Sequence, residues 1–223
     1  MSESRERGRY LNLGAVILAA GFSSRMNLWK PEARIGGIPI IQRAIVPALH
    51  ICRQVVVVGG YRYNELKDLV LAGLNASAEE CAKIEFVENK NFSTGMFTSV
   101  KAGMNRIRGT AEGIFLVPGD MPFINEATYR SLAELLAAKE QIDLVVPVTS
   151  SGVRGSDGRV KKGHPILLCY RACQLILKQP DESILRDVLK NISSEQCLVD
   201  DEGICVDIDD VADLEKYEHH LEN

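Results

Sequence analysis

A turn of small residues followed by two cations, between Leu18 and Lys30, could bind a polyphosphate. The apolar run before it ends in Ala20 and Gly21, where backbone N–H groups could approach an anion closely because no large side chain intervenes. Arg25 would bind phosphate oxygens with its planar fork, and Lys30 would act as a point charge. From spacing alone, a strand-to-helix turn with two cations facing solvent is an equally open interpretation.

Other nucleotide-binding loops are excluded by their missing residues. The chain contains no G-x-x-x-x-G-K-[ST] sequence, so it has no Walker-type loop. The first turn holds one glycine, Gly21, so no G-x-G-x-x-G fingerprint follows the first apolar run. A G-x-S-x-G nucleophile elbow is also absent from the sequence.

A carboxylate, Asp120, follows the apolar run Ile114–Val117 and precedes a proline-stiffened turn. If the two apolar runs are parallel strands, Asp120 and Gly21 lie at the same edge of the sheet. Proteins often hold Mg²⁺ by one or two carboxylates together with substrate phosphates, so Asp120 is a candidate metal ligand. The alternative is a capping or turn aspartate before the next helix, although Asn125 is nearer to that start.

A second group of acids lies at Asp207, Asp209 and Asp210. We expect a strand at 205–208, which places residues 207 and 209 on one face. Two carboxylates on one face repel each other unless a cation or water relieves them. The alternative is a helix cap, which is the favoured interpretation for Asp210 and stays open for Asp207 and Asp209.

The segment 91–99, Asn-Phe-Ser-Thr-Gly-Met-Phe-Thr-Ser, precedes a helix whose N-terminus could hold negative charge or the polar edge of a base. Read alone, it is better interpreted as a capped helix start. His164 follows a breaker-rich stretch at 149–163, and a loop of that length is uncommon unless it is functional or disordered. A lone histidine is more often structural than catalytic. After Lys161 and Lys162, however, His164 could contact an anionic substrate.

Short apolar runs alternate with longer amphipathic segments, which predicts an α/β fold built from βαβ units. Continuous apolar strands are typical of parallel sheets covered on both faces. The expected strands are 15–19, 55–58, 83–87, 114–117, 144–146, 166–168 and 205–208. The expected helices are 39–51, 62–74, 96–107, 125–138, 171–178, 182–191 and 210–221. Residues 1–10 are predicted to be a flexible tail, and residues 11–223 a single domain.

Composition is ordinary for a globular protein. The 223 residues carry a formal net charge of −4, with 46% hydrophobic and 25% charged residues. The mild acidity argues against nucleic-acid binding. No apolar run approaches the ~20 residues of a membrane span, and the start of the chain lacks the apolar stretch of a signal peptide. None of the six cysteines forms a C-x-x-C pair, which argues against a structural zinc site. A reducing cytoplasm fits this cysteine pattern best.

Five segments match, in order, the motifs of one enzyme family. They are LAAGxSxRMGxxK from Leu18 to Lys30, with Asn27 for the last glycine; Asn91, Gly95, Met96 and Ser99; Asp-Met-Pro at 120–122; Gly-His-Pro at 163–165; and Asp-Ile-Asp at 207–209. From about residue 14 to 217, the chain therefore resembles the nucleotidyltransferases that activate the molybdenum cofactor. The segment Leu18–Gly21, with Ala20, resembles that of the cytidylyl branch of the family. Cytidylyl enzymes have Leu-Ala-Ala-Gly at this place, whereas guanylyl enzymes have Leu-Ala-Gly-Gly.

The resemblance implies a three-layer, Rossmann-like nucleotidyltransferase fold of the glycosyltransferase-A type with a mainly parallel, seven-stranded sheet. It implies transfer of a nucleotidyl group with release of pyrophosphate, and Mg²⁺ as the cofactor. The implied catalytic residues are Arg25, Lys30 and Asp120, and the implied metal ligands are Asp120, Asp207 and Asp209. The implied nucleotide-binding residues are Leu18, Ala19, Ala20, Gly21, Arg25, Lys30, Asn91, Gly95 and Ser99. The acceptor would meet Lys161, Lys162 and His164.

We therefore expect a cytoplasmic enzyme that transfers CMP from CTP to the terminal phosphate of molybdopterin or the molybdenum cofactor. Its product could pass to a molybdenum hydroxylase. The alternatives are a guanylyltransferase, a nucleotidyltransferase for sugar phosphates or other small phosphates, and a non-catalytic chaperone that holds the cofactor. The presence of Arg25, Lys30 and Asp120 together favours catalysis.

Overall fold

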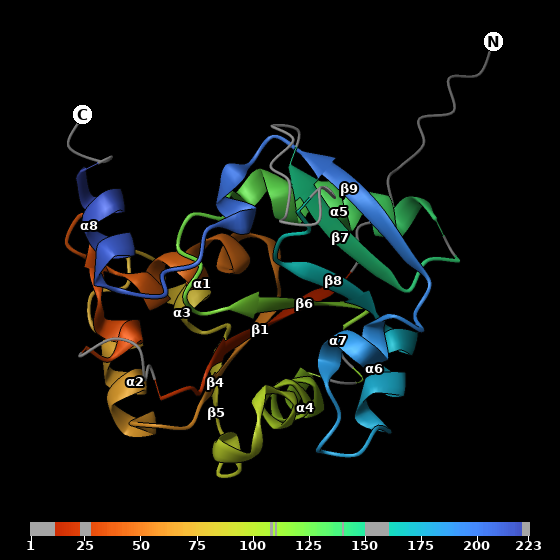
Figure 1. Cartoon of the computed structure of the whole chain (residues 1–223), viewed down its shortest axis with the longest axis horizontal. Coiled ribbons are helices and arrows are strands. Elements are labelled where there is room, and N and C mark those ends of the chain that lie inside the picture. The colour runs from red at the N-terminus through yellow and green to blue at the C-terminus, as the bar shows by residue number, and fades with distance from the viewer. Residues whose placement is uncertain are drawn as a thin grey trace.

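The computed structural model describes residues 12–22, 28–107, 109, 111–139, 141–149 and 161–219. Within them, seven strands form one central sheet (Figure 1). Their spatial order is β5 (Ile84–Glu88), β4 (Gln54–Gly59), β1 (Leu13–Ala19), β6 (Gly113–Pro118), β8 (Ile166–Cys169), β7 (Leu144–Thr149) and β9 (Ser194–Val199). Every neighbouring pair is parallel except those of β8, which is antiparallel to both β6 and β7. The prediction of a mainly parallel α/β sheet is confirmed.

Helices cover both faces of this sheet, which gives three layers (Figure 1). One face packs against α1 (Ile40–Ile51), α2 (Tyr63–Leu71) and α5 (Glu126–Ala138). The other packs against α4 (Met96–Ile107), α6 (Tyr170–Leu177) and α7 (Leu185–Leu189). The smaller elements are α3 (Ala78–Cys81), α8 (Val211–His219), the 3₁₀ turns η1 (Lys30–Glu32), η2 (Phe92–Thr94) and η3 (Glu202–Cys205), and a two-stranded ribbon of β2 (Arg34–Ile35) and β3 (Ile38–Pro39). In this part of the chain, no helix has the length and hydropathy to cross a membrane.

The apolar strands are buried on both faces, as their continuous patterns predict. In β1, Ala15 and Ile17 point into the core under α1 and α5, while Val16 points into the core under α4. The same alternation divides Val55 and Val57 of β4 from Val56 and Val58. Because both faces of these strands are buried, their sequences are continuously apolar and do not alternate between polar and apolar residues.

The prediction of a strand at 205–208 is wrong. Residues 202–205 form η3, and the chain from 206 to 209 is irregular. The seventh strand is β9, which lies at the edge of the sheet. Its sequence, Ser-Glu-Gln-Cys-Leu-Val, has three polar residues before three apolar ones, so it lacks the longer apolar run that predicts a strand buried on both faces. Ile208 instead enters a small third core with Ile35 and Leu214. The helix expected at 182–191 is also shorter, because a turn at 180–183 precedes it.

A buried carboxylate, Asp201, fastens the segment after β9 to the start of α5. Its Oδ2 accepts hydrogen bonds from the backbone N–H of Asn125 (2.8 Å) and from Oγ1 of Thr128 (2.6 Å). Its Oδ1 accepts one from the N–H of Gly203 (2.9 Å). A Cβ on Gly203 would lie 2.0 Å from the carbonyl oxygen of Phe123, so only glycine allows this approach.

Replacing Asp201 with alanine should lower the free energy of unfolding by about 3 kcal/mol, because three donors lose their acceptor in a buried place. Urea denaturation followed by circular dichroism would measure the change. The matched control is Glu202→Ala, which removes an exposed acid one position away and should shift stability by less than about 0.5 kcal/mol. Equal midpoints for the two variants would contradict this role of Asp201.

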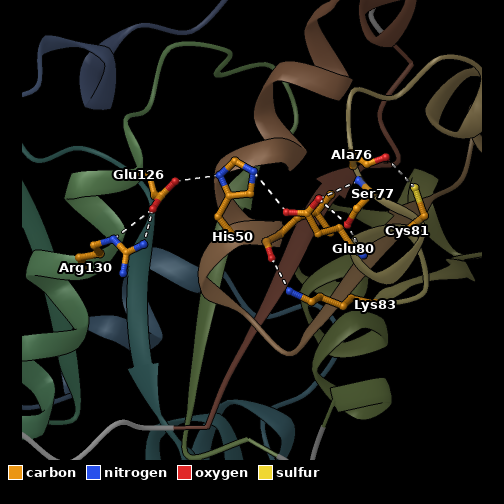
Figure 2. A network of polar contacts seen from close by, with 9 residues as sticks. His50, Ala76, Ser77, Glu80, Cys81, Lys83, Glu126 and Arg130 are labelled. Carbon is orange, nitrogen blue, oxygen red and sulfur yellow. Dashed lines mark hydrogen bonds and ion pairs between the residues drawn. The ribbon is translucent and has the colours of Figure 1, made fainter.

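His50, near the end of α1, lies between carboxylates from two other helices (Figure 2). Its Nδ1 is 2.7 Å from Oε2 of Glu126 on α5, and its Nε2 is 3.4 Å from Oε1 of Glu80 on α3. Arg130 also pairs with Glu126. Hydrogen bonds from Arg130 and from His50 hold the pKa of Glu126 below its ordinary value.

This shift predicts a small loss of stability in acid. A carboxyl whose pKa is lower in the folded state stabilises the protein fully above its unfolded pKa, and that contribution disappears as the pH falls through the folded pKa. Glu126→Gln should therefore flatten the fall in stability below about pH 4.5. The difference should stay under about 1 kcal/mol because the side chain is one-third exposed. Urea denaturation at pH 7 and pH 3.5 would measure it. Parallel pH profiles for variant and wild type would show that the pairing adds nothing.

Candidate active site

The ends of β1 and β6 bring the two predicted site segments together. The strands are parallel neighbours, with Leu18 opposite Pro118 in the register. Gly119 donates its N–H to the carbonyl oxygen of Leu18 at 2.9 Å, and a Cβ on Gly119 would lie only 2.9 Å from that oxygen. Asp120 therefore leaves the sheet at the same edge as the turn after β1, as expected.

Lys30 lies between two carboxylates that are distant from it in sequence. Its Nζ is 2.7 Å from Oδ1 of Asp209 and 3.3 Å from Oδ2 of Asp120. The 206–209 segment reaches this place because the N–H of Ile208 donates to the backbone carbonyl of Asp120 at 2.9 Å. The side chain of Lys30 is 15% exposed, against 32% for Asp120 and 41% for Asp209, so the acids face outward and the ammonium lies beneath them.

The electrostatics of this cluster stabilise the charged form of Lys30. Burial by itself would lower the pKa of Lys30, but the hydrogen bond to Asp209 and the charges of Asp120 and Asp209 raise it above its ordinary value. Two carboxylates facing one cation provide the oxygen donors that Mg²⁺ prefers. No group of three or more His, Cys, Asp or Glu that could hold a metal occurs in the described ranges. Substrate oxygens and water would have to complete the shell of any ion bound here.

The structure separates the three acids near the end of the chain. Asp209 joins Lys30, whereas Asp210 caps α8 by accepting the N–H of Asp213 at 3.0 Å, as predicted. Asp207 is exposed. The idea that residues 207 and 209 share a strand face fails because this segment is not a strand.

The turn after β1 combines buried residues with open space. Leu18 is half-buried, and Ala19 and Ala20 are buried. Gly21 is exposed, and apart from its chain neighbours no atom of the described residues lies within 4 Å of where its Cβ would be. The carbonyl oxygen of Ala20 accepts the N–H of Tyr61 at 3.2 Å, which ties the turn to the end of β4. Arg25 falls in 23–27, outside the described residues.

Asn89, directly after β5, organises the 91–99 segment and was not among the predicted site residues. Its amide donates to Oγ1 of Thr98 (2.8 Å) and to Oγ of Ser99 (2.9 Å), and its Oδ1 accepts the N–H of Asn91 (3.0 Å). Ser99 is thus buried, while Asn91 and Gly95 are exposed. Gly95 has φ +136°, a conformation that favours glycine. A polar residue at a strand end was the available signal for Asn89.

The predicted acceptor residues lie beside the 204–209 segment. Nζ of Lys161 donates to the carbonyl of Cys205 at 2.9 Å, and the N–H of His164 donates to the carbonyl of Ile204 at 2.9 Å. Lys162 is exposed and bridges to β7. The rest of the predicted loop, 150–160, lies outside the described residues.

The ring of His164 lies near the carboxylates of Asp120 and Asp207. Burial lowers the pKa of His164, although the charges of Asp120 and Asp207 act in the opposite direction. The imidazole is therefore mostly neutral at neutral pH. Its Nδ1 is buried and has no hydrogen-bond partner among the described residues. The structure thus places His164 near Asp120, with one ring nitrogen unused.

Comparison with known proteins gives consistent matches. Residues 15–197 match the family described as the MobA-like NTP transferase domain, a range that contains Lys30, Asp120 and His164 but stops before Asp209. The chain is 27% identical over 197 residues to the molybdenum cofactor cytidylyltransferase of Escherichia coli (strain K12), covering 88% of this chain and 91% of that protein.

Two solved structures share the fold. Rv0371c from Mycobacterium tuberculosis H37Rv, in complex with manganese, has a TM-score of 0.68 and 17% identity, over 93% of this chain and 98% of that one. The 4-diphosphocytidyl-2C-methyl-D-erythritol synthase from Anaerococcus prevotii DSM 20548 has a TM-score of 0.69 and 15% identity, over 95% and 96%. These likenesses confirm the expected three-layer nucleotidyltransferase fold.

Proposed function

The chain belongs to the family of MobA-like NTP transferase domains and is a nucleotidyltransferase, and we propose that it transfers CMP from CTP to the terminal phosphate of molybdopterin or the molybdenum cofactor. The observation that carries the proposal is the cluster of Lys30, Asp120 and Asp209 at the ends of β1 and β6. Ligands bind at this edge in open α/β sheets. The cluster supplies the charges that transfer from a triphosphate needs.

In the proposed reaction, a phosphate oxygen of the acceptor attacks the α-phosphorus of CTP. The bond from that phosphorus to the oxygen bridging the β-phosphate breaks, and pyrophosphate leaves with the electron pair. Lys30, and Arg25 with it, would neutralise charge on the triphosphate, which is the main requirement for such a transfer. Asp120 and Asp209 would hold Mg²⁺, which acts as a Lewis acid and template when bound.

We assign the base to the turns around 18–21 and 91–95. Open space at Gly21 and Gly95 supports this, because no atom of the described residues lies within 4 Å of an added Cβ at either. Ser99 would act through Asn89, which holds the second turn. The identity of the base as cytosine is supported by Ala20 and by the cytidylyltransferase relative.

Three further proposals concern the setting. A single domain at 11–223 is supported by one sheet with a core on each face. The predicted tail, 1–10, lies outside the described residues. A cytoplasmic location is supported by six free cysteines. The third proposal is that the product passes to a molybdenum hydroxylase.

A screen of nucleotides against acceptors tests the function. Purified protein with Mg²⁺ is given CTP, GTP, UTP or ATP together with molybdopterin, the molybdenum cofactor or a set of sugar phosphates, and pyrophosphate is measured. Release only with CTP and a molybdopterin acceptor supports the proposal. Preference for GTP would indicate a guanylyltransferase, and turnover of sugar phosphates would indicate another branch of the fold. Tight binding of the cofactor without pyrophosphate would indicate a chaperone.

Lys161 and Lys162 should affect the acceptor and not the nucleotide. Both are exposed beside the 204–209 segment, and the acceptor is an anionic pterin phosphate. Replacing both with glutamine should raise KM for molybdopterin by about tenfold at low salt and flatten its salt dependence, while KM for CTP changes little. The control is Lys139→Gln, which removes a lysine paired with Glu195 on β9. Unchanged acceptor kinetics in the double variant would return these lysines, and His164 with them, to a purely structural role.

A further inference from the structure

Arg62, between β4 and α2, has an unusual backbone conformation. Its φ of 55° and ψ of 41° are left-handed, and it is the single non-glycine residue with positive φ in the described part of the chain. Such a conformation is uncommon for a residue with a long side chain, and it persists where surrounding contacts hold it. The contacts of the guanidinium therefore need an explanation.

The guanidinium of Arg62 contacts both sides of the turn that carries Lys30. It stacks over the ring of Trp29 at 4.5 Å, and its Nη1 lies 3.5 Å from Oε1 of Glu32. Trp29 directly precedes Lys30 and Glu32 follows it by two positions. On its other side, Nε of Arg62 donates to Oε2 of Glu65 on α2 at 2.8 Å. One side chain thus links the turn to the β4–α2 corner.

The turn is also held by its own hydrogen bonds and by apolar packing. Two backbone hydrogen bonds close η1, from Glu32 to the carbonyl of Trp29 (3.0 Å) and from Ala33 to that of Lys30 (3.1 Å). Trp29 is 6% exposed and packs into the main core, but its Nε1 has no hydrogen-bond partner among the described residues. Apolar packing and the stacked guanidinium are what fix the ring. Because Lys30 is the next residue, its backbone position follows that of Trp29.

We propose that Arg62 is a positioning residue for Lys30, holding the η1 turn so that the ammonium meets the triphosphate at Asp120 and Asp209. The proposal rests on the proposed function, since it assigns Arg62 a part in the same site. Arg62 is not a catalytic residue in this scheme. It acts through Trp29 and Glu32, and its effect should vanish when Lys30 is absent.

A double-mutant cycle tests this directly. Lys30→Met should lower kcat/KM for CTP by about 100-fold. Arg62→Ala should lower it by about tenfold, since a small misplacement of a reacting group is enough. If Arg62 acts through Lys30, the double variant should match Lys30→Met within about threefold. Losses that multiply to about 1000-fold would overturn the proposal.

Conservative and control variants separate positioning from folding. Arg62→Lys keeps a cation over the ring and should recover most of the rate lost in Arg62→Ala. Glu65→Gln removes the partner of Arg62 that lies outside the turn, and should keep near-wild-type kinetics. No recovery in Arg62→Lys, with normal circular dichroism, would count against stacking as the cause.

The sole tryptophan of the chain, Trp29, gives a readout that needs no substrate. Arg62→Ala should shift its emission to longer wavelength and increase quenching by acrylamide, whereas Glu65→Gln should do neither. The cycle is repeated on CTP binding by calorimetry, without acceptor. If the wild type binds CTP but releases no pyrophosphate with molybdopterin, the proposed acceptor fails, and the binding cycle still decides the role of Arg62. If the losses in CTP binding free energy of the two single variants add up in the double variant, the positioning role of Arg62 is overturned by the binding data as well.

Discussion

Asp120→Asn is expected to lower the rate of pyrophosphate release from CTP by at least about 100-fold while leaving the fold intact. The carboxylate is one of two that face the ammonium of Lys30, and the amide has the same shape without the charge. The contact that holds the 206–209 segment uses the backbone carbonyl of Asp120, which the substitution leaves in place. The loss should therefore appear in the chemical step and not in stability.

Steady-state pyrophosphate release at saturating CTP, together with a urea denaturation curve, would measure both effects. The matched control is Asp181→Asn, which removes a carboxylate from another ion pair, 2.5 Å from Nζ of Lys101, outside the cluster. It should keep a rate within about twofold of wild type, as expected for a surface substitution. Near-wild-type turnover in Asp120→Asn would remove Asp120 from the mechanism.

Lys30→Met should lower the rate about as much as Asp120→Asn does, but it should strengthen the binding of a metal ion. Methionine keeps most of the length of the side chain and removes the charge. Since Lys30 would contact phosphates and not the base, the rate should fall about 100-fold with CTP and with any other accepted nucleotide alike. In the variant, Asp120 and Asp209 lack the ammonium of Lys30. Nucleotide-free variant should therefore bind Mn²⁺ at least about tenfold more tightly than nucleotide-free wild type.

Electron paramagnetic resonance of free Mn²⁺, titrated with nucleotide-free protein, would measure this affinity, and Lys101→Met would serve as the control. Equal or weaker Mn²⁺ binding in Lys30→Met would show that the ammonium and the metal do not share the two carboxylates. A loss of rate selective for CTP would show that Lys30 reads the base.

The parts of the fold and site that followed from sequence are those set by local pattern. Continuous apolar runs predicted five of the strands, and the alternating run at 83–87 predicted β5. The carboxylate at the end of β6 placed Asp120 at the same sheet edge as the turn after β1. β9 was missed because its three polar residues are followed by only three apolar ones, and the antiparallel direction of β8 has no local signature. The sequence did not tell whether Asp207 or Asp209 joins Lys30 and Asp120, because this depends on the tertiary hydrogen bond from Ile208 to Asp120. Arg62 and Asn89 act through contacts between elements, which spacing in the sequence does not reveal.

The segment from Asp201 to Asp209 has a consequence for how the enzyme loses activity. Lys30 and Asp209 are 179 positions apart, and this segment joins no strand of the sheet. It is held by Asp201, by the hydrogen bonds of Ile208, Lys161 and His164, and by the packing of Ile204 and Ile208, without any strand pairing. Segments with few such contacts open locally at a lower free energy than the whole domain. Its amides should therefore exchange hydrogen sooner than those of β1, and inactivation in mild denaturant should come while the seven strands are still paired.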